Sequence, residues 1–183
     1  ARLRYGGDVA LAPLPQARIV VDRFHIQRMA NDALEKLRKR IRKDLPARQR
    51  LKLKDERFLL LKRQHDLKGA DMTRALEWFR QFPQLGEAHA LKEGFLSIWD
   101  HKSRPEAEAA CATWLGNIPP ELAATFKDLT TAVHNWHDEI FSYFEQPITN
   151  AYTESVNRLA KDMNRMGRGY SFEVIRARML YNE

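Results

Sequence analysis

Residues 26–45 read IQRMANDALEKLRKRIRKDL, and this stretch has the period of an amphipathic helix. One face collects the apolar side chains, which are Ile26, Met29, Ala30, Ala33, Leu34, Leu37, Ile41 and Leu45. The other face is mostly cationic, with Arg28, Lys36, Arg38, Lys39, Arg42 and Lys43. Pro46 has no amide hydrogen to continue the ladder, so the helix is predicted to end before it. The stretch therefore predicts a helical protein with one basic surface.

Similar periods predict helices in the rest of the chain, with short loops between them. The expected ranges are 71–82, 85–100, 105–115, 121–144, 150–166 and 172–181. Pro105 and Pro120 suit first helical turns, and the turn at 167–169 separates the last two helices. A second basic stretch continues to about Arg63 before the first of these ranges.

The aromatic residues of these ranges recur at helical spacing, which predicts a packed core and not a platform for stacking bases. They are Trp78, Phe79, Phe82, Phe95, Trp99, Trp114, Phe126, Trp136, Phe141 and Phe144. With 183 residues, 44% of them hydrophobic, the chain has enough material for one domain and is not a disordered protein.

Other protein classes are excluded by composition. No apolar run reaches the ~18 residues that a membrane span needs. The single cysteine, Cys111, rules out an internal disulfide framework and a cysteine-rich zinc module. The first residues have no apolar signal region, so we expect a cytosolic protein.

The net charge of +7 is unevenly distributed. Residues 1–68 carry +11, residues 69–145 carry −6 and residues 146–183 carry +2. A basic segment of this kind attracts polyanions, nucleic acids first, although a solvated helix surface has the same composition.

A short β-branched run, Arg18 to Asp22, follows a proline-containing loop at residues 10–17 and predicts one strand. It ends in a carboxylate, and the end of a buried strand is a favourable position for catalysis or for holding Mg²⁺. The alternative is that Asp22 caps the helix that follows.

The helix expected over 150–166 carries a single carboxylate among amides and cations. At 100° per residue, one face holds Asn150, Glu154, Asn157, Arg158, Lys161 and Arg165. The opposite face holds Tyr152, Val156, Leu159, Ala160, Met163 and Met166. Glu154 could hold a metal while the cations grip a phosphate backbone, or it could pair with Arg158 on a solvated face. Together, Asp22 and Glu154 suit two-metal phosphoryl transfer, which needs carboxylates from separate elements.

The order of these motifs resembles the IS-L-three type of bacterial insertion-sequence transposases, which have an RNase H-like DDE domain. The resemblance rests on residues 20–25 (VVDRFH) with the basic helix after them, on residues 85–98 (LGEAHALKEGFLSI), and on the TN…E..NR..K pattern over 149–161 with Arg165 and residues 167–170. It covers about residues 10–182.

The resemblance implies that Asp22 and Glu154 are the second and third acidic residues of the catalytic triad, with two Mg²⁺ or Mn²⁺ ions as cofactors. It implies a mainly α chain with one strand near 18–22, which is the C-terminal part of an α/β domain with a helical insertion. The expected division is 18–68, 69–145 for the insertion, and 146–183. The expected DNA contacts, with element ends and target DNA, are Arg23, His25, Lys36, Arg38, Lys39, Arg42, Lys43, Asn150, Asn157, Arg158, Lys161 and Arg165.

The first acidic residue of the triad has no assigned match, because Asp8 lies outside any strand-like run. We therefore expect a C-terminal fragment that cleaves and joins DNA only as part of a larger protein, which could act as a homo-oligomer.

Three rival interpretations remain. The chain could be a helical nucleic-acid-binding module that uses residues 36–63, or a transposase remnant whose basic helix pairs with the acidic segment 69–145. His134 and His137, with Asp138 beside them, could also serve a metal hydrolase, but no third ligand is identifiable.

Overall fold

In the computed structural model, residues 20–145, 151–167 and 170–181 are described. The chain divides into two compact units, Ala1–Pro147 and Ile148–Glu183. The boundaries predicted within residues 18–145 remain a prediction. No helix in the described residues is both long and apolar enough to cross a membrane.

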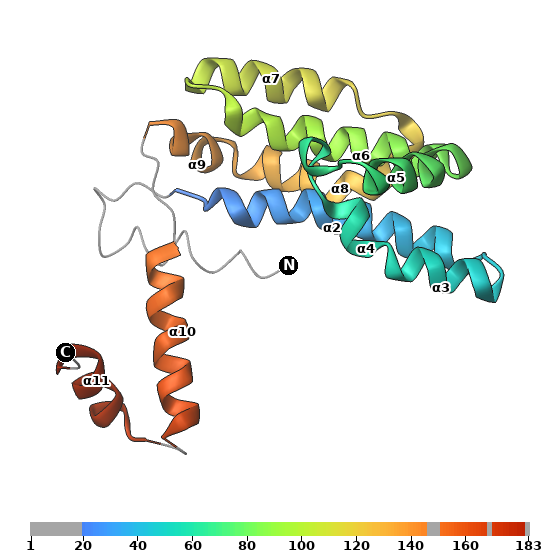
Figure 1. Ribbon diagram of the computed structural model, residues 1–183. Helices are drawn as coiled ribbons and strands as arrows, with labels where there is room; N and C mark the ends of the chain where they lie inside the picture. Colours follow the sequence, from blue (N-terminus) through green and yellow to red (C-terminus); the bar gives the residue numbers. More distant parts are fainter. Residues whose placement is uncertain (1–19, 146–150, 168–169, 182–183) are drawn as a thin grey trace. The chain divides into compact units, whose positions relative to one another are not determined.

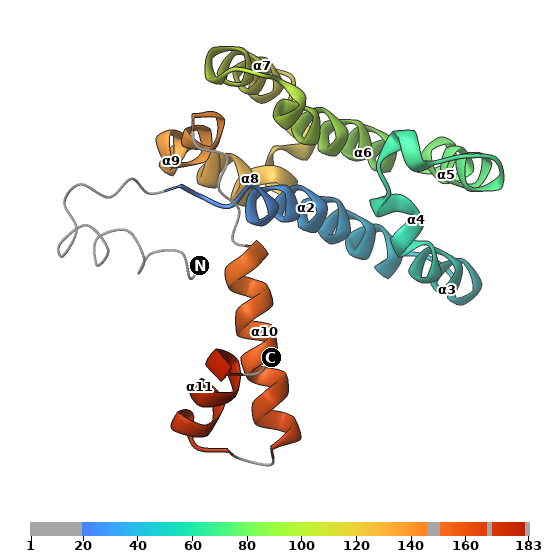
Figure 2. The ribbon, with the colours of Figure 1, turned by 60° about the vertical axis from the view of Figure 1, so that its left-hand side comes forward.

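The first unit is built around one long helix, α2 (Arg23–Lys43), which packs on α6 (Pro83–Leu96) and α8 (Pro120–Asn135) (Figures 1 and 2). The expected apolar face of α2 is buried, with Ile26 and Leu34 at its centre. Deeply buried side chains from the other two helices, such as Phe95 and Phe126, complete the core.

The remaining helices surround these three. The chain runs through α3 (Ala47–Asp55), α4 (Arg57–Leu61), η2 (Gln64–Asp66), α5 (Ala70–Gln81), η3 (Ser97–Asp100), α7 (Arg104–Gly116), α9 (His137–Phe141) and η4 (Ser142–Phe144). The second unit pairs α10 (Ala151–Met166) with α11 (Phe172–Tyr181). The predicted ranges are mainly helical and follow in the predicted order along the described residues, α3 and α4 are additional helices, and Pro105 and Pro120 lie in first turns as expected.

Two predicted helices are interrupted. The range 121–144 breaks at Trp136, whose φ of −127° and ψ of 29° are not helical. The new direction buries Ile140 and Phe141 of α9 against the core. The range 85–100 begins earlier, at Pro83, and its last turn tightens into η3.

The aromatic residues confirm the prediction of a core. Trp78, Phe95, Trp99, Trp114, Phe126 and Phe141 are buried, and Phe79, Phe82, Trp136 and Phe144 pack against them. Phe95 lies between Trp99 and Trp114, with ring centroids 5.1 and 4.8 Å away. None of these rings is free to stack on a base.

The predicted strand is wrong for its described residues, Val20 to Asp22, which form no strand. The amide of Val21 instead donates to the carbonyl of Glu139 at 3.0 Å, next to α9. A strand needs a paired neighbour, and within the described ranges none is present. Arg18 and Ile19 lie outside the described residues. The mainly helical prediction is confirmed, while an RNase H-like sheet is not part of the described structure.

Candidate DNA strand-transfer site

Asp22 is the N-cap of α2. Its Oδ1 accepts a hydrogen bond of 2.9 Å from the amide of Phe24, which satisfies one of the unpaired N–H groups at the helix start. Its Oδ2 lies 3.6 Å from Nδ1 of His25. The Asp22 side chain is only 6% exposed, whereas that of His25 is 50% exposed. The capping alternative is therefore confirmed, and the second carboxylate oxygen makes no capping hydrogen bond but lies near His25.

The residue after Asp22 is held between two rings. The guanidinium of Arg23 lies 5.1 Å from the ring centroid of Phe24 and 5.2 Å from that of Tyr143 in η4. Its Nε is buried and has no hydrogen-bond partner. Such stacking fixes a cation next to Asp22, at a helix N-terminus that itself favours anions.

The described residues do not by themselves fit a two-metal site. They contain no cluster of three or more His, Cys, Asp or Glu side chains that could hold a metal. Asp22 offers a carboxylate of which one oxygen already accepts a backbone hydrogen bond. A hard cation needs several oxygen ligands, so Asp22 alone is insufficient.

The other predicted ligand, Glu154, lies on α10, which begins at Ala151 as the sequence indicates. The side chains of Glu154 and Asn157, and the whole of Asn150, lie outside the described residues. The two units are described separately, so the distance from Asp22 to Glu154 stays a prediction.

The cationic side of α10 is described at three positions. Arg158, Lys161 and Arg165 are exposed, as expected, and Arg165 pairs with Asp162 at 3.1 Å. On the opposite face Met163 is buried, but Leu159 and Met166 are exposed. The apolar face of this helix is thus only partly covered within the described residues.

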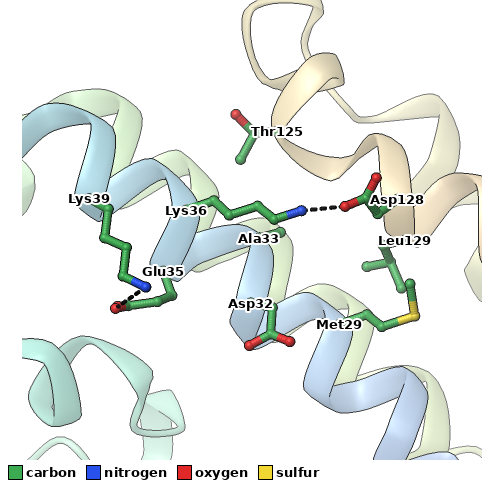
Figure 3. A pocket seen from close by; sticks show the side chains of 9 residues that line it. All are labelled: Met29, Asp32, Ala33, Glu35, Lys36, Lys39, Thr125, Asp128 and Leu129. Carbon is green, nitrogen blue, oxygen red and sulfur yellow. Dashed lines mark hydrogen bonds and ion pairs between the residues drawn. The ribbon is translucent and has the colours of Figure 1, made fainter. Parts of the chain in front are cut away.

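On α2, the cations nearest the middle of the helix are engaged with carboxylates. Lys36 forms an ion pair with Asp128 of α8, across a cavity of about 290 Å³ that Met29 and Leu129 also line (Figure 3). Lys39 lies 3.6 Å from Glu35 on the same helix. These amino groups therefore already have carboxylate partners within the protein.

Arg38 is buried, since it is only 3% exposed and does not reach the surface. Its Nε and Nη2 donate to both oxygens of Glu35 at 2.7 and 2.8 Å. Its Nη1 donates to the carbonyl of Leu53 at 2.6 Å, at the end of α3. Arg38 therefore joins α2 to α3, and its burial does not favour the predicted contact with DNA, which stays a prediction. The signal that could have indicated this is Glu35, one of two acids inside a basic helix and the one spaced i,i+3 from Arg38.

Glu35 is the centre of this cluster. Burial acts to raise its pKa, but the hydrogen bond from Arg38 and the charges of Arg38, Arg57 and Lys39 outweigh it and hold the pKa below the ordinary value. Glu35 is therefore ionised at neutral pH, and its charge is needed to balance the buried guanidinium.

The basic residues after α4 are held by α6. Nζ of Lys92, a fully buried residue, donates to the carbonyl oxygens of Leu61 and Lys62 at 3.2 and 2.7 Å. Glu93 accepts hydrogen bonds from Nε of Arg63 and, through the same oxygen, from the amide of Gln64, at 3.1 and 2.9 Å. This part of the basic segment is therefore part of the core architecture.

A different set of cations forms no ion pair in the described structure, although Nη2 of Arg50 donates to the carbonyl of Leu45 at 3.1 Å. Among the described residues, none of the Lys and Arg side chains from 40 to 54 forms an ion pair with a carboxylate. They are Arg40, Arg42, Lys43, Arg48, Arg50, Lys52 and Lys54. All are exposed except Arg42, which is half-buried. Arg42 and Lys43 belong to the predicted DNA contacts, whereas the four cations of α3 were not predicted individually.

The histidine pair forms no metal site in the described structure. His134 and His137 line an open cavity beside Leu115. Nδ1 of His137 lies 4.0 Å from Glu108 and 3.8 Å from Asp138, which makes it a member of a surface charge network.

The comparisons with known proteins give one match. A model of the IS-L-three type DDE family, described as transposase, matches residues 8–179. No curated protein and no solved structure matches the chain.

Proposed function

Because the chain belongs to the IS-L-three type family of DDE transposases, we propose that it acts in DNA transposition by metal-dependent cleavage of element ends and strand transfer. DNA is the substrate that this family implies. In this proposal, Asp22 and Glu154 are the second and third acidic residues of the site, and Mg²⁺ or Mn²⁺ is the cofactor.

The buried carboxylate of Asp22 is the observation that carries the proposal. A carboxylate that only caps a helix can stay exposed to solvent. The side chain of Asp22 is instead only 6% exposed, and only its Oδ1 accepts the capping hydrogen bond. Arg23 and the start of α2 supply positive charge beside it. A phosphate of a DNA strand would be held there by hydrogen bonds and charge, close to an acidic group.

A transposition assay in bacterial cells tests the catalytic assignment. In the transposase that carries this chain, Asp22→Asn and Glu154→Gln should each lower transposition by at least about a thousandfold, because each removes a negative charge from a phosphoryl-transfer site. Asp32→Asn and Glu173→Gln are the matched controls at exposed positions and should leave transposition unchanged. Full transposition in Glu154→Gln would contradict the assignment.

We also propose that the chain alone is inactive, since only two of the three acidic residues are assigned. Incubation of the isolated chain with supercoiled DNA and Mn²⁺ should give no nicked product. Nicking that disappears in Asp22→Asn would overturn this.

The second candidate function is a helical nucleic-acid-binding module without catalysis. It is favoured by the absence of strands from the described residues and by the exposed cations of residues 40–54. The same pair of variants separates the two functions, because a binding module keeps its activity in Asp22→Asn and Glu154→Gln.

A further inference from the structure

We propose that the tip of the first unit, residues 40–54, binds the phosphate backbone of duplex DNA away from the Asp22 site. The tip consists of the last turn of α2, the short turn after it and α3 as far as Lys54, at the far end of α2 from Asp22 (Figures 1 and 2). The inference rests on the proposed function in one respect, which is that DNA is the substrate. It names a surface for that substrate that the catalytic assignment does not include.

The first argument is the sorting of charges along the basic segment. Residues 36–63 contain thirteen Lys and Arg. Six of them, all outside the tip, pair with carboxylates, and they are Lys36, Arg38, Lys39, Arg57, Lys62 and Arg63. The seven in the tip pair with none in the described structure, and Asp44, the one acid of the tip, makes no ion pair either. The tip therefore presents a net charge of +6 that the protein does not neutralise.

The second argument is that α3 carries like charges at neighbouring positions. Arg48 and Lys52 are spaced i,i+4, and so are Arg50 and Lys54. Each such pair destabilises a helix by about 0.2–0.5 kcal/mol. α3 buries only one residue, Leu53, so its packing does not require these charges. A polyanion relieves the repulsion, because each phosphate brings a negative charge between cations.

The third argument is that the tip is held in a defined position. Arg38 donates to the carbonyl of Leu53 at 2.6 Å, and Arg38 is fixed by two hydrogen bonds to buried Glu35. The end of α3 is thereby joined to the middle of α2. Cations on a positioned helix lose less freedom on binding than cations on a loop.

Duplex DNA explains the tip better than an acidic protein does. Protein–protein interfaces are depleted in Lys and rich in aromatic residues. The tip has three lysines, no aromatic residue and one large exposed apolar side chain, that of Leu51. α2 is 21 residues long, so the tip lies about 30 Å from Asp22 along the helix. At one phosphate per 3.4 Å of each strand, this is about nine base pairs. The two positions are therefore separate on one duplex.

The experiment measures binding of the 183-residue chain to a fluorescein-labelled 30-base-pair duplex by anisotropy, over a series of salt concentrations. The triple variant Arg48→Gln/Lys52→Gln/Lys54→Gln should bind about 10- to 100-fold more weakly at 0.1 M salt, and its slope of log K against log salt should fall by two to three, since each phosphate contact contributes about 0.9. The matched control is Arg80→Gln/Lys102→Gln/Lys127→Gln, which removes three exposed cations whose side chains also form no ion pair within 4.0 Å among the described residues. Its affinity should stay within about twofold of the parent, and its slope should not change by as much as one phosphate contact, about 0.9.

The two slopes together decide the inference. Equal weakening in both triple variants would overturn it in favour of a net-charge effect. Unchanged binding in the tip variant would overturn it directly, as would a tip variant that loses salt-sensitive self-association in sedimentation while keeping its DNA affinity. The catalytic assignment is tested by the transposition of Asp22→Asn and Glu154→Gln, whereas the tip is tested by DNA affinity and its salt dependence. Failure of the inference is therefore distinct from failure of the catalytic assignment.

Discussion

The tip and the two flanks of the basic segment have the same kind of sequence but opposite surroundings. The flanks, residues 36–39 and 57–63, lie on either side of the tip, residues 40–54, and every Lys and Arg in the flanks has a carboxylate partner. The partners come from α2, α5, α6, η3 and α8. The tip has no such partner in the described structure.

This difference separates two roles of positive charge. In the flanks, the cations connect helices, so their removal should lower the free energy of unfolding. In the tip, the cations repel one another, so their removal should weaken the binding of DNA. The net charge of a segment, which is what the sequence gives directly, does not distinguish paired cations from unpaired ones.

The largest effect on stability is expected at Arg38. Arg38→Met leaves Glu35 ionised and buried without its hydrogen bonds and releases the carbonyl of Leu53. The free energy of unfolding should fall by about 3–5 kcal/mol. Urea unfolding followed by circular dichroism measures it.

The control for this change is the double variant Glu35→Leu/Arg38→Met. It removes both charges together, so the loss should be smaller than in Arg38→Met. A change of less than about 1 kcal/mol in Arg38→Met would contradict the structural role assigned to this residue.

The next effect is a pH dependence of stability at His89 of α6, which contacts the carbonyl of Lys62 in the flank 57–63. Burial, and after it the charge of Lys92, lowers the pKa of His89 to about 4 from the ordinary value of 6.5, with a carbonyl contact to Lys62 and the charge of Glu93 acting against the shift. Below pH 6.5 the unfolded chain binds a proton that the folded chain does not, so stability is lost as the pH falls from about 6.5 to 4, by at most about 3 kcal/mol.

His89→Gln should remove this component, because glutamine does not titrate. The difference in unfolding free energy between the parent and His89→Gln, measured from pH 7 to pH 4, isolates it from the carboxylates that titrate over the same range. If this difference stays constant with pH, the histidine is not held in its neutral form.

A smaller effect is expected at the exposed pair of Lys36 and Asp128. The hydrogen bond and charge of Lys36 hold the pKa of Asp128 below its ordinary value. Both side chains are more than half exposed, so their coupling in a double-mutant cycle of Lys36→Gln and Asp128→Asn should be below about 1 kcal/mol and should fall with salt. A coupling of several kcal/mol would show that the cavity between α2 and α8 excludes solvent.

The smallest effect has the opposite sign. Arg48→Gln removes one like-charge pair from α3, so the chain should become more stable by a few tenths of a kcal/mol at low salt, and the gain should vanish at 1 M salt. Urea unfolding at the two salt concentrations measures it. A loss of stability would mean that Arg48 has a partner and that the tip is not free.

The sequence predicts local structure well here and distant pairing poorly. The face of α2, the aromatic core and the proline starts of α7 and α8 follow from spacing within one helix. The burial of Arg38 does not, because it depends on Leu53 and Arg57, which return to the helix only after the turn at Pro46. The strand expected at residues 18–22 shows the same limit, since β-branched residues indicate a strand only where a neighbour pairs with it.

For the candidate site, the motif order was sufficient to identify the family, which the match over residues 8–179 confirms. The sequence left two alternatives for Asp22, a helix cap or a metal ligand, and only the capping hydrogen bond is seen in the described structure. The exposed cations of α3 were missed as individual contacts because composition does not indicate which cations find partners.

A crystal structure of the chain grown with Mn²⁺ tests the central claim most directly, which is that Asp22 and Glu154 belong to one metal-dependent site. The account predicts an anomalous scattering peak between the two carboxylates that is lost in Asp22→Asn. Ordered carboxylates on separate surfaces, with no shared peak, would contradict it and leave the tip as the functional surface of this chain.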